Sequence, residues 1–405
     1  MTYHEGARIE LAVGAVAHGG HCVARHDGMV VFVRHALPGE KVVAEVTGAR
    51  RGYLRADAVE VVEASPDRVP APCPYARPGA CGGCDLQHAG EAAQLRWKAA
   101  VVGEQLARLA GLAPAEVETL GVRVAALPGG LLGWRSRMRY TVSADGRAGL
   151  LKHRSHEVVP IDLCRIAHPA LQRLDVTATR WPEAEAVEVV ASSAGDVSVL
   201  ATYPDRVRLV SGPAQVREDA AGRRWRVDAS GFWQGHRAAP DTFAGAVLEL
   251  LSPRPGEHAW DLYGGAGLFA AVLAVPVGPT GTVTLVEADR RGAAAARANL
   301  SDLTGVRVVR APVEAALRRG LSRPDVVVLD PPRSGAGAEV VRAVVAAAPR
   351  AVAYVACDPA AFARDVRTFR DAGWRLAALR GYDAFPMTHH VELVGLLSPG
   401  GGSRT

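Results

Sequence analysis

A strand, a turn and a helix follow one another in Ala351-Val-Ala-Tyr-Val-Ala-Cys-Asp-Pro-Ala-Ala-Phe-Ala-Arg-Asp365. The apolar run predicts a buried strand that ends at Cys357, and Asp-Pro then predicts the start of a helix. In open α/β sheets, ligands bind beside the carboxyl ends of the strands. Cys357 therefore stands where a thiol can meet a ligand, and the positive end of the following helix should favour its thiolate.

The same alternation of strand and helix extends through residues 221–405. The predicted strands are His258–Leu262, Thr282–Glu287, Val306–Arg310, Asp325–Asp330 and Ala351–Cys357. The predicted helices are Leu268–Val275, Arg290–Leu300, Val313–Arg319, Ala338–Ala348 and Ala360–Ala372. This pattern predicts an α/β domain with a mostly parallel, doubly wound, Rossmann-like sheet.

Two regions with β-strand patterns precede this domain. Residues 1–64 hold short alternating runs between Gly-rich turns, which predict a small β-barrel. Residues 65–220 begin with a proline-rich loop, continue with an amphipathic helix over Glu91–Leu109, and then predict a mainly antiparallel sheet. In the barrel, a set of basic residues either lines a nucleic-acid face or forms solvated loop charges: His18, His21, Arg34, Arg50, Arg51 and Arg55.

Size and composition limit the classes of protein that fit the chain. Its 405 residues indicate two or three domains, and 49% hydrophobic with 22% charged residues indicates a globular protein. The net charge of +5 suits a polyanionic partner, although many basic proteins bind none. No signal peptide and no apolar run of membrane-spanning length stand out, so we expect a cytoplasmic protein with reduced thiols and no membrane contact.

Three cysteines lie together in Cys73-Pro-Tyr-Ala-Arg-Pro-Gly-Ala-Cys81-Gly-Gly-Cys84. The two glycines leave the backbone free to turn both thiolates of the Cys-x₂-Cys pair onto one metal centre. A closed site needs a fourth thiolate, and Cys164 is the best candidate because Cys22 lies in the barrel. Four cysteines suit either zinc or a [4Fe–4S] cluster. The alternative is a loop of unligated thiols.

A glycine-rich loop follows the first predicted strand of the α/β domain, in Asp261-Leu-Tyr-Gly-Gly-Ala-Gly-Leu268. Its glycines allow a tight turn and a close approach to a ligand. Glu287 ends the next strand, where an acidic residue accepts hydrogen bonds from ribose hydroxyls. The loop lacks the Gly-x-Gly-x-x-Gly of a dinucleotide site. S-adenosylmethionine, which has a ribose but no pyrophosphate, therefore fits better, and an ordinary βα turn is the alternative.

Two carboxylates stand at further strand ends. Asp330 follows a buried strand in Leu329-Asp-Pro-Pro-Arg-Ser-Gly335, and Glu392 closes His389-His-Val-Glu392. Together with the Cys357 thiol they suggest a nucleophile with acid–base partners. The structural alternatives are a buried apolar Cys357, Asp330 as a helix N-cap, and Glu392 as a surface salt-bridge acid.

These motifs, in this order, resemble the RNA uracil-C5 methyltransferase family, whose members make 5-methyluridine in bacterial ribosomal or transfer RNA. The matching segments are Asp330-Pro-Pro-Arg-Ser-Gly, Tyr354-Val-Ala-Cys-Asp-Pro-Ala, Phe385-Pro-Met-Thr-His-His-Val-Glu, Asp261-Leu-Tyr-Gly-Gly-Ala-Gly and Ser230-Gly-Phe-Trp-Gln-Gly. The resemblance implies an N-terminal OB-like TRAM barrel, a central domain with a [4Fe–4S] cluster and a C-terminal class I methyltransferase domain. The cluster ligands it implies are Cys73, Cys81, Cys84 and Cys164.

The resemblance also implies the roles of the site residues. The S-adenosylmethionine contacts would be Gln234, Asp261, Tyr263, Gly264, Gly267, Leu268, Glu287 and Asp330. Cys357 would attack C6 of the uracil ring, Glu392 would remove the C5 proton, and Asp330 would bond uracil N3 or orient the methyl donor. The chain departs from the family at Asp358, where Asn is usual, and at Gly265, Leu268 and Pro312.

The expected partner is RNA, without an obligatory protein partner. A barrel together with a cluster favours ribosomal RNA, specifically 23S rRNA, as the substrate. Transfer RNA is the alternative substrate, and a non-catalytic iron–sulfur RNA-binding protein with an inactive methyltransferase domain is the alternative function.

Overall fold

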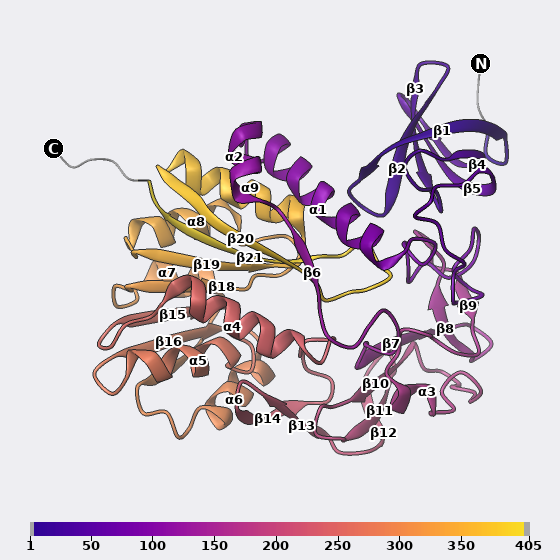
Figure 1. The fold of residues 1–405 in the computed structure, drawn as a ribbon. Coiled ribbons are helices and arrows are strands. Elements are labelled where there is room, and N and C mark those ends of the chain that lie inside the picture. Colours follow the sequence, from indigo (N-terminus) through magenta and orange to yellow (C-terminus); the bar gives the residue numbers. More distant parts are fainter. Residues whose placement is uncertain (1–3, 401–405) are drawn as a thin grey trace.

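The computed structural model describes residues 4–400, and within that range the chain forms a barrel, a central sheet and a larger α/β domain (Figure 1). The ends of the predicted outer domains, residues 1–3 and 401–405, lie outside the described residues. The barrel consists of β1 (Arg8–Ala17), β2 (His21–His26), β3 (Met29–Arg34), β4 (Lys41–Arg50) and β5 (Tyr53–Glu63). These strands close in the order β1-β2-β3-β5-β4, which confirms the predicted barrel.

The central sheet is antiparallel throughout, as predicted. Its order is β12-β11-β10-β7-β8-β9. The strands are β7 (Arg137–Val142), β8 (Ala148–Leu151), β9 (Val158–Pro160), β10 (Ala186–Ala191), β11 (Val197–Thr202) and β12 (Val207–Ser211). The short helix α3 (Pro169–Gln172) packs against β10. One face of this sheet is apolar because alternate residues such as Met138 and Tyr140 are buried.

The α/β domain contains an eight-stranded sheet in the order β17-β16-β15-β18-β19-β21-β20-β6. Its parallel part is β15 (His258–Leu262), β16 (Thr282–Glu287), β17 (Val306–Arg310), β18 (Val326–Leu329) and β19 (Ala351–Ala356). The helices that follow these strands are α5 (Leu268–Val277), α6 (Arg290–Asn299), α7 (Val313–Arg319), α8 (Gly337–Ala346) and α9 (Pro359–Asp371). The predicted doubly wound sheet is thus confirmed, and β20 (Trp374–Asp383) and the antiparallel β21 (Glu392–Pro399) extend it.

Helices cover both faces of this sheet. One apolar core joins α4 (Ala239–Leu251), α5 and α6 with the hairpin of β13 (Gln215–Ala220) and β14 (Arg223–Asp228). The opposite core joins α7, α8 and α9 with α1 (Glu91–Arg108). Among the helices that the structure describes, none combines the length and the apolar character needed to cross a bilayer.

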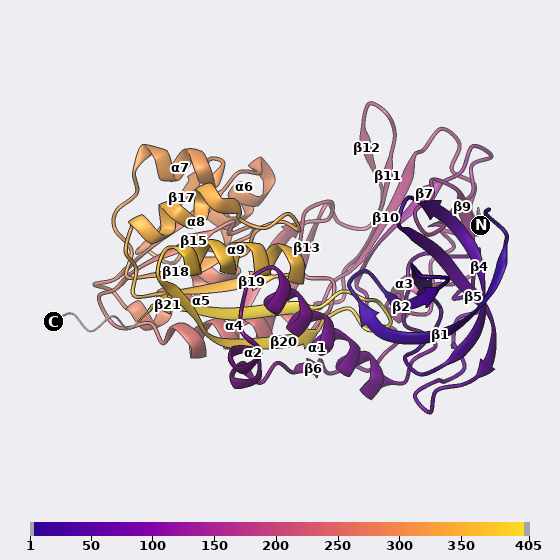
Figure 2. The same cartoon turned by 90° about the horizontal axis from the view of Figure 1, so that it is seen from above.

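Residues 91–126 differ from the predicted domain division, which placed them in the central domain. The strand β6 (Val124–Ala126) pairs with β20 at the edge of the α/β sheet. Along the chain, α2 (Pro114–Leu120) lies between α1 and β6. Figure 2 shows α1 running from the α/β domain toward the barrel. Trp97 and Val101 of α1 pack in the barrel core, whereas Val102 and Leu106 pack beside α9. The position of this segment along the chain does not predict these contacts, because its apolar side chains pack against partners far away in the sequence.

Candidate active site

The candidate site lies where the strand order of the α/β sheet reverses. The chain winds outward in one direction from β15 through β16 to β17 and then returns to place β18 on the other side of β15. The loops after β15 and β18 therefore diverge at their carboxyl ends and leave room for a ligand. Most of the sequence-predicted site residues stand at this edge, at the ends of β15, β16, β18 and β19.

The glycine-rich loop between β15 and α5 is held tightly against its neighbours. Gly267 has a φ of 103°, and a Cβ there would lie 2.7 Å from Leu300. A Cβ on Gly264 would lie 2.4 Å from Leu285. The backbone N–H of Gly265 donates to Glu287 Oε2 at 2.9 Å. A larger side chain at 264 would displace the loop from Leu285 of β16, and one at 267 would displace it from Leu300 at the end of α6, so these glycines allow the close packing of the loop.

Asp261 carries an acceptor that the protein leaves unpaired. Its Oδ2 accepts from the backbone N–H of Ala270 at 2.8 Å, but Oδ1 is buried without a hydrogen-bond partner. Burial, together with the charges of Asp330 and Glu287, raises the pKa of Asp261 to about 7. A buried acceptor without a partner is costly unless a ligand supplies a donor. The residues present therefore fit a ligand rich in hydroxyl or ammonium donors.

Glu287, Tyr263 and Leu268 complete the surroundings of the loop. The carboxylate of Glu287 also accepts from the backbone N–H of Asp289 at 2.6 Å. Each carboxylate oxygen keeps a free lone pair, so Glu287 can still accept a hydrogen bond from a ribose hydroxyl. Tyr263 is half-buried in a left-handed conformation, with a φ of 67°. The side chain of Leu268 packs into the apolar core below the loop.

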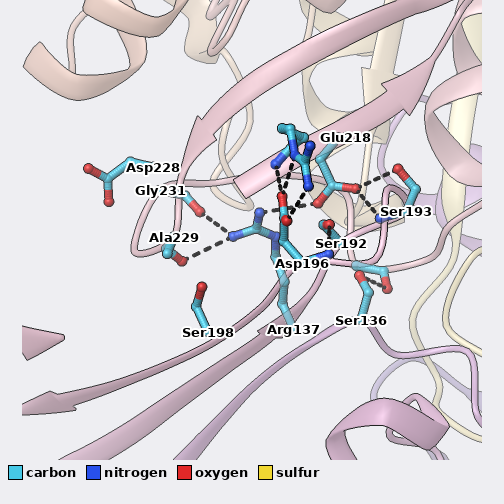
Figure 3. Close-up of polar contacts among 12 residues, drawn as sticks. Ser136, Arg137, Ser192, Ser193, Asp196, Ser198, Glu218, Asp228, Ala229 and Gly231 are labelled. Atoms are coloured by element: carbon cyan, nitrogen blue, oxygen red, sulfur yellow. Dashed lines mark hydrogen bonds and ion pairs between the residues drawn. The ribbon is translucent and has the colours of Figure 1, made fainter. Parts of the chain in front are cut away.

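Gln234 lies on a loop that the central sheet holds in place. Arg137 of β7 donates through Nη1 to the carbonyl oxygens of Gly231 and Ala229, at 2.9 Å and 3.2 Å (Figure 3). Ser136 donates through its backbone N–H and its hydroxyl to the carbonyl of Gly235. Arg137 is itself oriented by Glu218, 3.4 Å away. The sequence contained no signal for this role, because Arg137 is an ordinary strand residue far from the loop along the chain.

Cys357 follows β19, and the next residue, Asp358, caps α9 by accepting from the backbone N–H of Ala361 at 2.7 Å. Burial raises the pKa of the Cys357 thiol to about 12, the charges of Glu392, Asp330 and Asp358 act in the same direction, and Arg333 opposes them. The expectation that the helix terminus would favour the thiolate is therefore wrong for the free protein. Three neighbouring carboxyl groups and a buried position outweigh the helix end.

Glu392 is the first residue of β21 and only 5% exposed. Burial and the charge of Asp330 raise its pKa well above the ordinary value, while Arg333 lowers it. The alternative of a surface salt-bridge acid is excluded by this burial. Burial also raises the pKa of Asp330 to about 7. The next helix, α8, is capped by Ala336, so Asp330 is not a helix N-cap either.

Cys357, Glu392 and Asp330 thus form one electrostatic group, and Arg333 is its cation. These residues lie on separate sequence motifs, and the structure brings them together. Two histidines lie nearby, one from the segment before Glu392 and one from the barrel. His389 bonds to Asp85 through Nδ1 at 2.6 Å, and His18 of the barrel lies 3.4 Å from Asp358.

The four predicted cluster cysteines line a single cavity of about 90 Å³: Cys73, Cys81, Cys84 and Cys164. The Cys164 charge acts on Cys81 and Cys84, which confirms their proximity. Across residues 4–400, however, no set of three or more His, Cys, Asp or Glu side chains is arranged to hold a metal ion. Gly82 allows this packing, since a Cβ there would lie 2.5 Å from the backbone of His153.

Comparison with known sequence families gives two matches. Residues 4–59 match the family described as TRAM domain, and residues 321–399 match the family described as tRNA (Uracil-5-)-methyltransferase. The first match covers most of the barrel, and the second contains Asp330, Cys357 and Glu392.

Relatives and solved structures match over nearly the whole chain. An uncharacterized RNA methyltransferase of Streptomyces avermitilis is 48% identical over 97% of this chain and 99% of its own length. Another from Corynebacterium efficiens is 35% identical over 97% of this chain and 95% of its own. The crystal structure of the Pyrococcus abyssi tRNA (uracil-54, C5)-methyltransferase with S-adenosyl-L-homocysteine shares the fold, with a TM-score of 0.71, 20% identity and coverage of 96% and 100%. The chain belongs to the RNA methyltransferase family of these relatives, and its C-terminal part matches the tRNA (Uracil-5-)-methyltransferase family model.

Proposed function

We propose that this protein methylates C5 of one uridine in RNA, using S-adenosylmethionine and a covalent adduct between Cys357 and C6 of the base. Beside the glycine-rich loop, Asp330 raises the pKa of both Cys357 and Glu392, and Glu392 raises that of Cys357; this grouping carries the proposal. This reaction requires a nucleophile and a base beside a binding pocket for the methyl donor. Cys357 and Glu392 supply the first two, and the unpaired acceptor of Asp261 needs a hydrogen-bond donor from a ligand.

The reaction begins at C6 because C5 of uracil is a weak nucleophile. The Cys357 thiolate adds to C6, and the electrons of the C5–C6 double bond move toward C5 and the C4 carbonyl oxygen as an enolate. S-adenosylmethionine, when bound, supplies the electrophilic methyl group for C5. Glu392 then takes the C5 proton, the C5–C6 double bond re-forms, and the thiolate is expelled. A carboxylate whose pKa is raised is a stronger base, which suits Glu392 to this step.

Asp330 has a supporting role in this proposal. With a pKa of about 7 it can hold a proton near neutrality and donate a hydrogen bond, or accept one from uracil N3–H when ionised. Arg333 stabilises the negative charge that develops on the thiolate and on the carboxylates. The methyl donor would lie between Gln234, the loop of Tyr263, Gly264, Gly267 and Leu268, the acceptor of Asp261, and Glu287.

We also propose that Cys73, Cys81, Cys84 and Cys164 hold a [4Fe–4S] cluster. The donor set is four thiols around one cavity, which matches the ligand requirement of such a cluster. The family resemblance of this cysteine set favours the cluster over zinc. None of Cys357, Asp330 and Glu392 lines this cavity, which supports a structural or RNA-binding role rather than a chemical one.

RNA binding is supported by a groove of about 580 Å³ between the barrel and the central domain. Its basic residues are Arg34, Arg50, Arg55, Arg77, Lys152 and Arg154. Phe32 adds an aromatic surface for a base. A target uridine must leave the base stack to reach the partly buried Cys357, and contacts between the groove and the RNA backbone can support that step. We favour 23S rRNA as the substrate, with tRNA as the alternative.

The test is nucleoside mapping by mass spectrometry of ribosomal and transfer RNA from cells with and without the gene. Loss of one 5-methyluridine, restored by the wild-type gene but not by Cys357→Ala, is the expected result. Unchanged 5-methyluridine in both RNA pools would contradict the proposal and favour an inactive methyltransferase domain.

Glu392→Gln provides a second test of the mechanism. Without the base, the methylated adduct keeps its C5 proton and cannot expel the thiolate, so a protein–RNA adduct should accumulate on denaturing gels. The double variant Cys357→Ala with Glu392→Gln should show no adduct. Normal turnover by Glu392→Gln would remove this residue from the base role.

A further inference from the structure

The turn between β1 and β2 of the barrel reaches the loop that carries the nucleophile. Nε2 of His18, in this turn, lies 3.4 Å from Oδ2 of Asp358, the residue directly after Cys357. The two side chains are 35% and 28% exposed, so the pair lies at the surface of the site rather than in a core. The barrel therefore contacts the first turn of α9 beside the reacting thiol.

Asp358 uses its two carboxylate oxygens for different purposes. Oδ1 caps α9 through Ala361, and Oδ2 faces His18. Burial alone would raise the pKa of Asp358, but the hydrogen bonds from His18 and Ala361 and the charge of Arg364 lower it. Asp358 is thus a carboxylate held by the barrel. An asparagine, usual at this position in the family, could cap the helix equally well but could not form an ion pair.

The turn that carries His18 is fixed on its other sides. Gly20 has a φ of 80°, and a Cβ there would lie 2.7 Å from Asp85, so only glycine allows this approach. Asp85 bonds to His389 at 2.6 Å and to Arg34 of β3 at 3.4 Å. The His389 ring meets the His18 ring edge-on, with centroids 6.3 Å apart. Three parts of the chain therefore position the His18 imidazole: the barrel turn itself, Asp85 directly after Cys84, and His389 in the loop before Glu392.

We propose that His18 is a positioning residue, and that its pair with Asp358 docks the barrel beside Cys357 and sets where barrel-bound RNA meets the nucleophile. This role rests on the proposed function, because it concerns the approach of RNA to the methylation site. It also explains the carboxylate at position 358: the charge that the reaction itself does not use serves the barrel contact.

A double-mutant cycle tests the docking in the free protein. His18→Ala and Asp358→Asn each remove the ion pair, and Asn keeps the helix cap. Both variants, and their combination, should increase amide hydrogen exchange by the same amount in residues 18–21 and 360–362. The control is His26→Ala, which removes another barrel pair, with Asp27, at the opposite end of β2. Unchanged exchange in both segments would overturn the docking, and so would the same increase in the control.

The positioning is tested by single-turnover transfer of labelled methyl groups to total RNA from cells that lack the gene. Each single variant should slow the transfer about fivefold, as expected for a partly exposed pair, and the double variant should be no slower. RNA binding and S-adenosylmethionine binding should stay unchanged. Additive losses, or weaker RNA binding at an unchanged transfer rate, would overturn the role of His18. A wild-type protein that transfers no methyl group would instead contradict the proposed function, and the exchange measurement would still decide the docking.

Discussion

Partial burial and the carboxyl groups around it raise the pKa of the Cys357 thiol to about 12. Arg333 is the opposing charge at both Cys357 and Glu392. Arg333→Met should therefore raise the pKa of the thiol further and slow its alkylation by iodoacetamide at any given pH, by roughly threefold to tenfold. In both proteins the alkylation rate should rise with pH between 7 and 9.

The alkylation rate of Cys357 is followed by peptide mass spectrometry, which separates it from the other thiols. Arg342→Met, an exposed arginine on α8, is the control and should alkylate like the wild type. Equal rates for Arg333→Met and the wild type would show that Arg333 does not act on the thiol.

The raised pKa of Asp261 predicts that the free energy of unfolding depends on pH. Its folded-state pKa of about 7 lies above the ordinary aspartate value of about 3.9. A raised pKa means that the contribution of this carboxyl to stability is complete below about pH 4 and is lost as the pH rises through about 7. The free energy of unfolding should therefore fall from pH 5 to pH 8, and less steeply in Asp261→Asn. Urea unfolding at both pH values measures this, and identical slopes would contradict the raised pKa.

At the scale of elements, sequence periodicity predicts the parallel strands that alternate with helices well and the short strand β6 poorly. Thr282–Glu287 has the predicted bounds, because a buried parallel strand is a largely apolar run between helices. Val306–Arg310 has them too, although β17 lies at the edge of the sheet and is only partly buried. The strand β6 has only three residues, and its pairing with β20 depends on a partner far along the chain. Such a strand has no local pattern to detect.

In the candidate site, too, residues with a local sequence pattern could be predicted and residues with distant partners could not. Cys357, Asp330 and Asp261 could be predicted because each stands at the end of a recognisable strand. Arg137 could not, because its importance comes from the loop that it contacts across the domain boundary. Long-range partners, rather than local propensity, determine which polar residues of the central domain matter.

Arg137→Lys tests whether the central sheet supports the methyl-donor site. A lysine cannot bond both carbonyl oxygens of the 229–235 loop and reach Glu218 as well. We expect roughly tenfold weaker S-adenosylmethionine binding by calorimetry, the size expected for losing hydrogen bonds from a charged donor. Arg147→Lys, in an exposed turn of the same sheet, should bind like the wild type. Unchanged affinity in Arg137→Lys would show that the loop keeps its conformation without this contact.

At the scale of the whole molecule, α1 connects the barrel to the loop that precedes Glu392. Gln94 accepts from the backbone N–H of Met387 at 2.9 Å, and Nζ of Lys98 bonds to the Asp383 carboxylate at 2.5 Å and to the carbonyl of Phe385 at 3.1 Å. Met387 packs in turn in the core of the central domain. The three units thus share one junction, and the loop that leads to Glu392 runs through it.

The buried pair of Lys98 and Asp383 should therefore be a major contribution to this junction. Both residues are 1% exposed, and burial lowers the pKa of Lys98 while Asp383 opposes that shift. Lys98→Met leaves the Asp383 charge buried without its partner, which should lower the free energy of unfolding by about 3–5 kcal/mol. Neutralising the second partner, in Lys98→Met with Asp383→Asn, should restore part of that loss. Arg96→Met, also on α1, removes an exposed ion pair with Asp67 and should lower the free energy of unfolding by less than about 1 kcal/mol. Urea unfolding compares the four proteins, and equal losses for Lys98→Met and Arg96→Met would show that the junction does not depend on this pair.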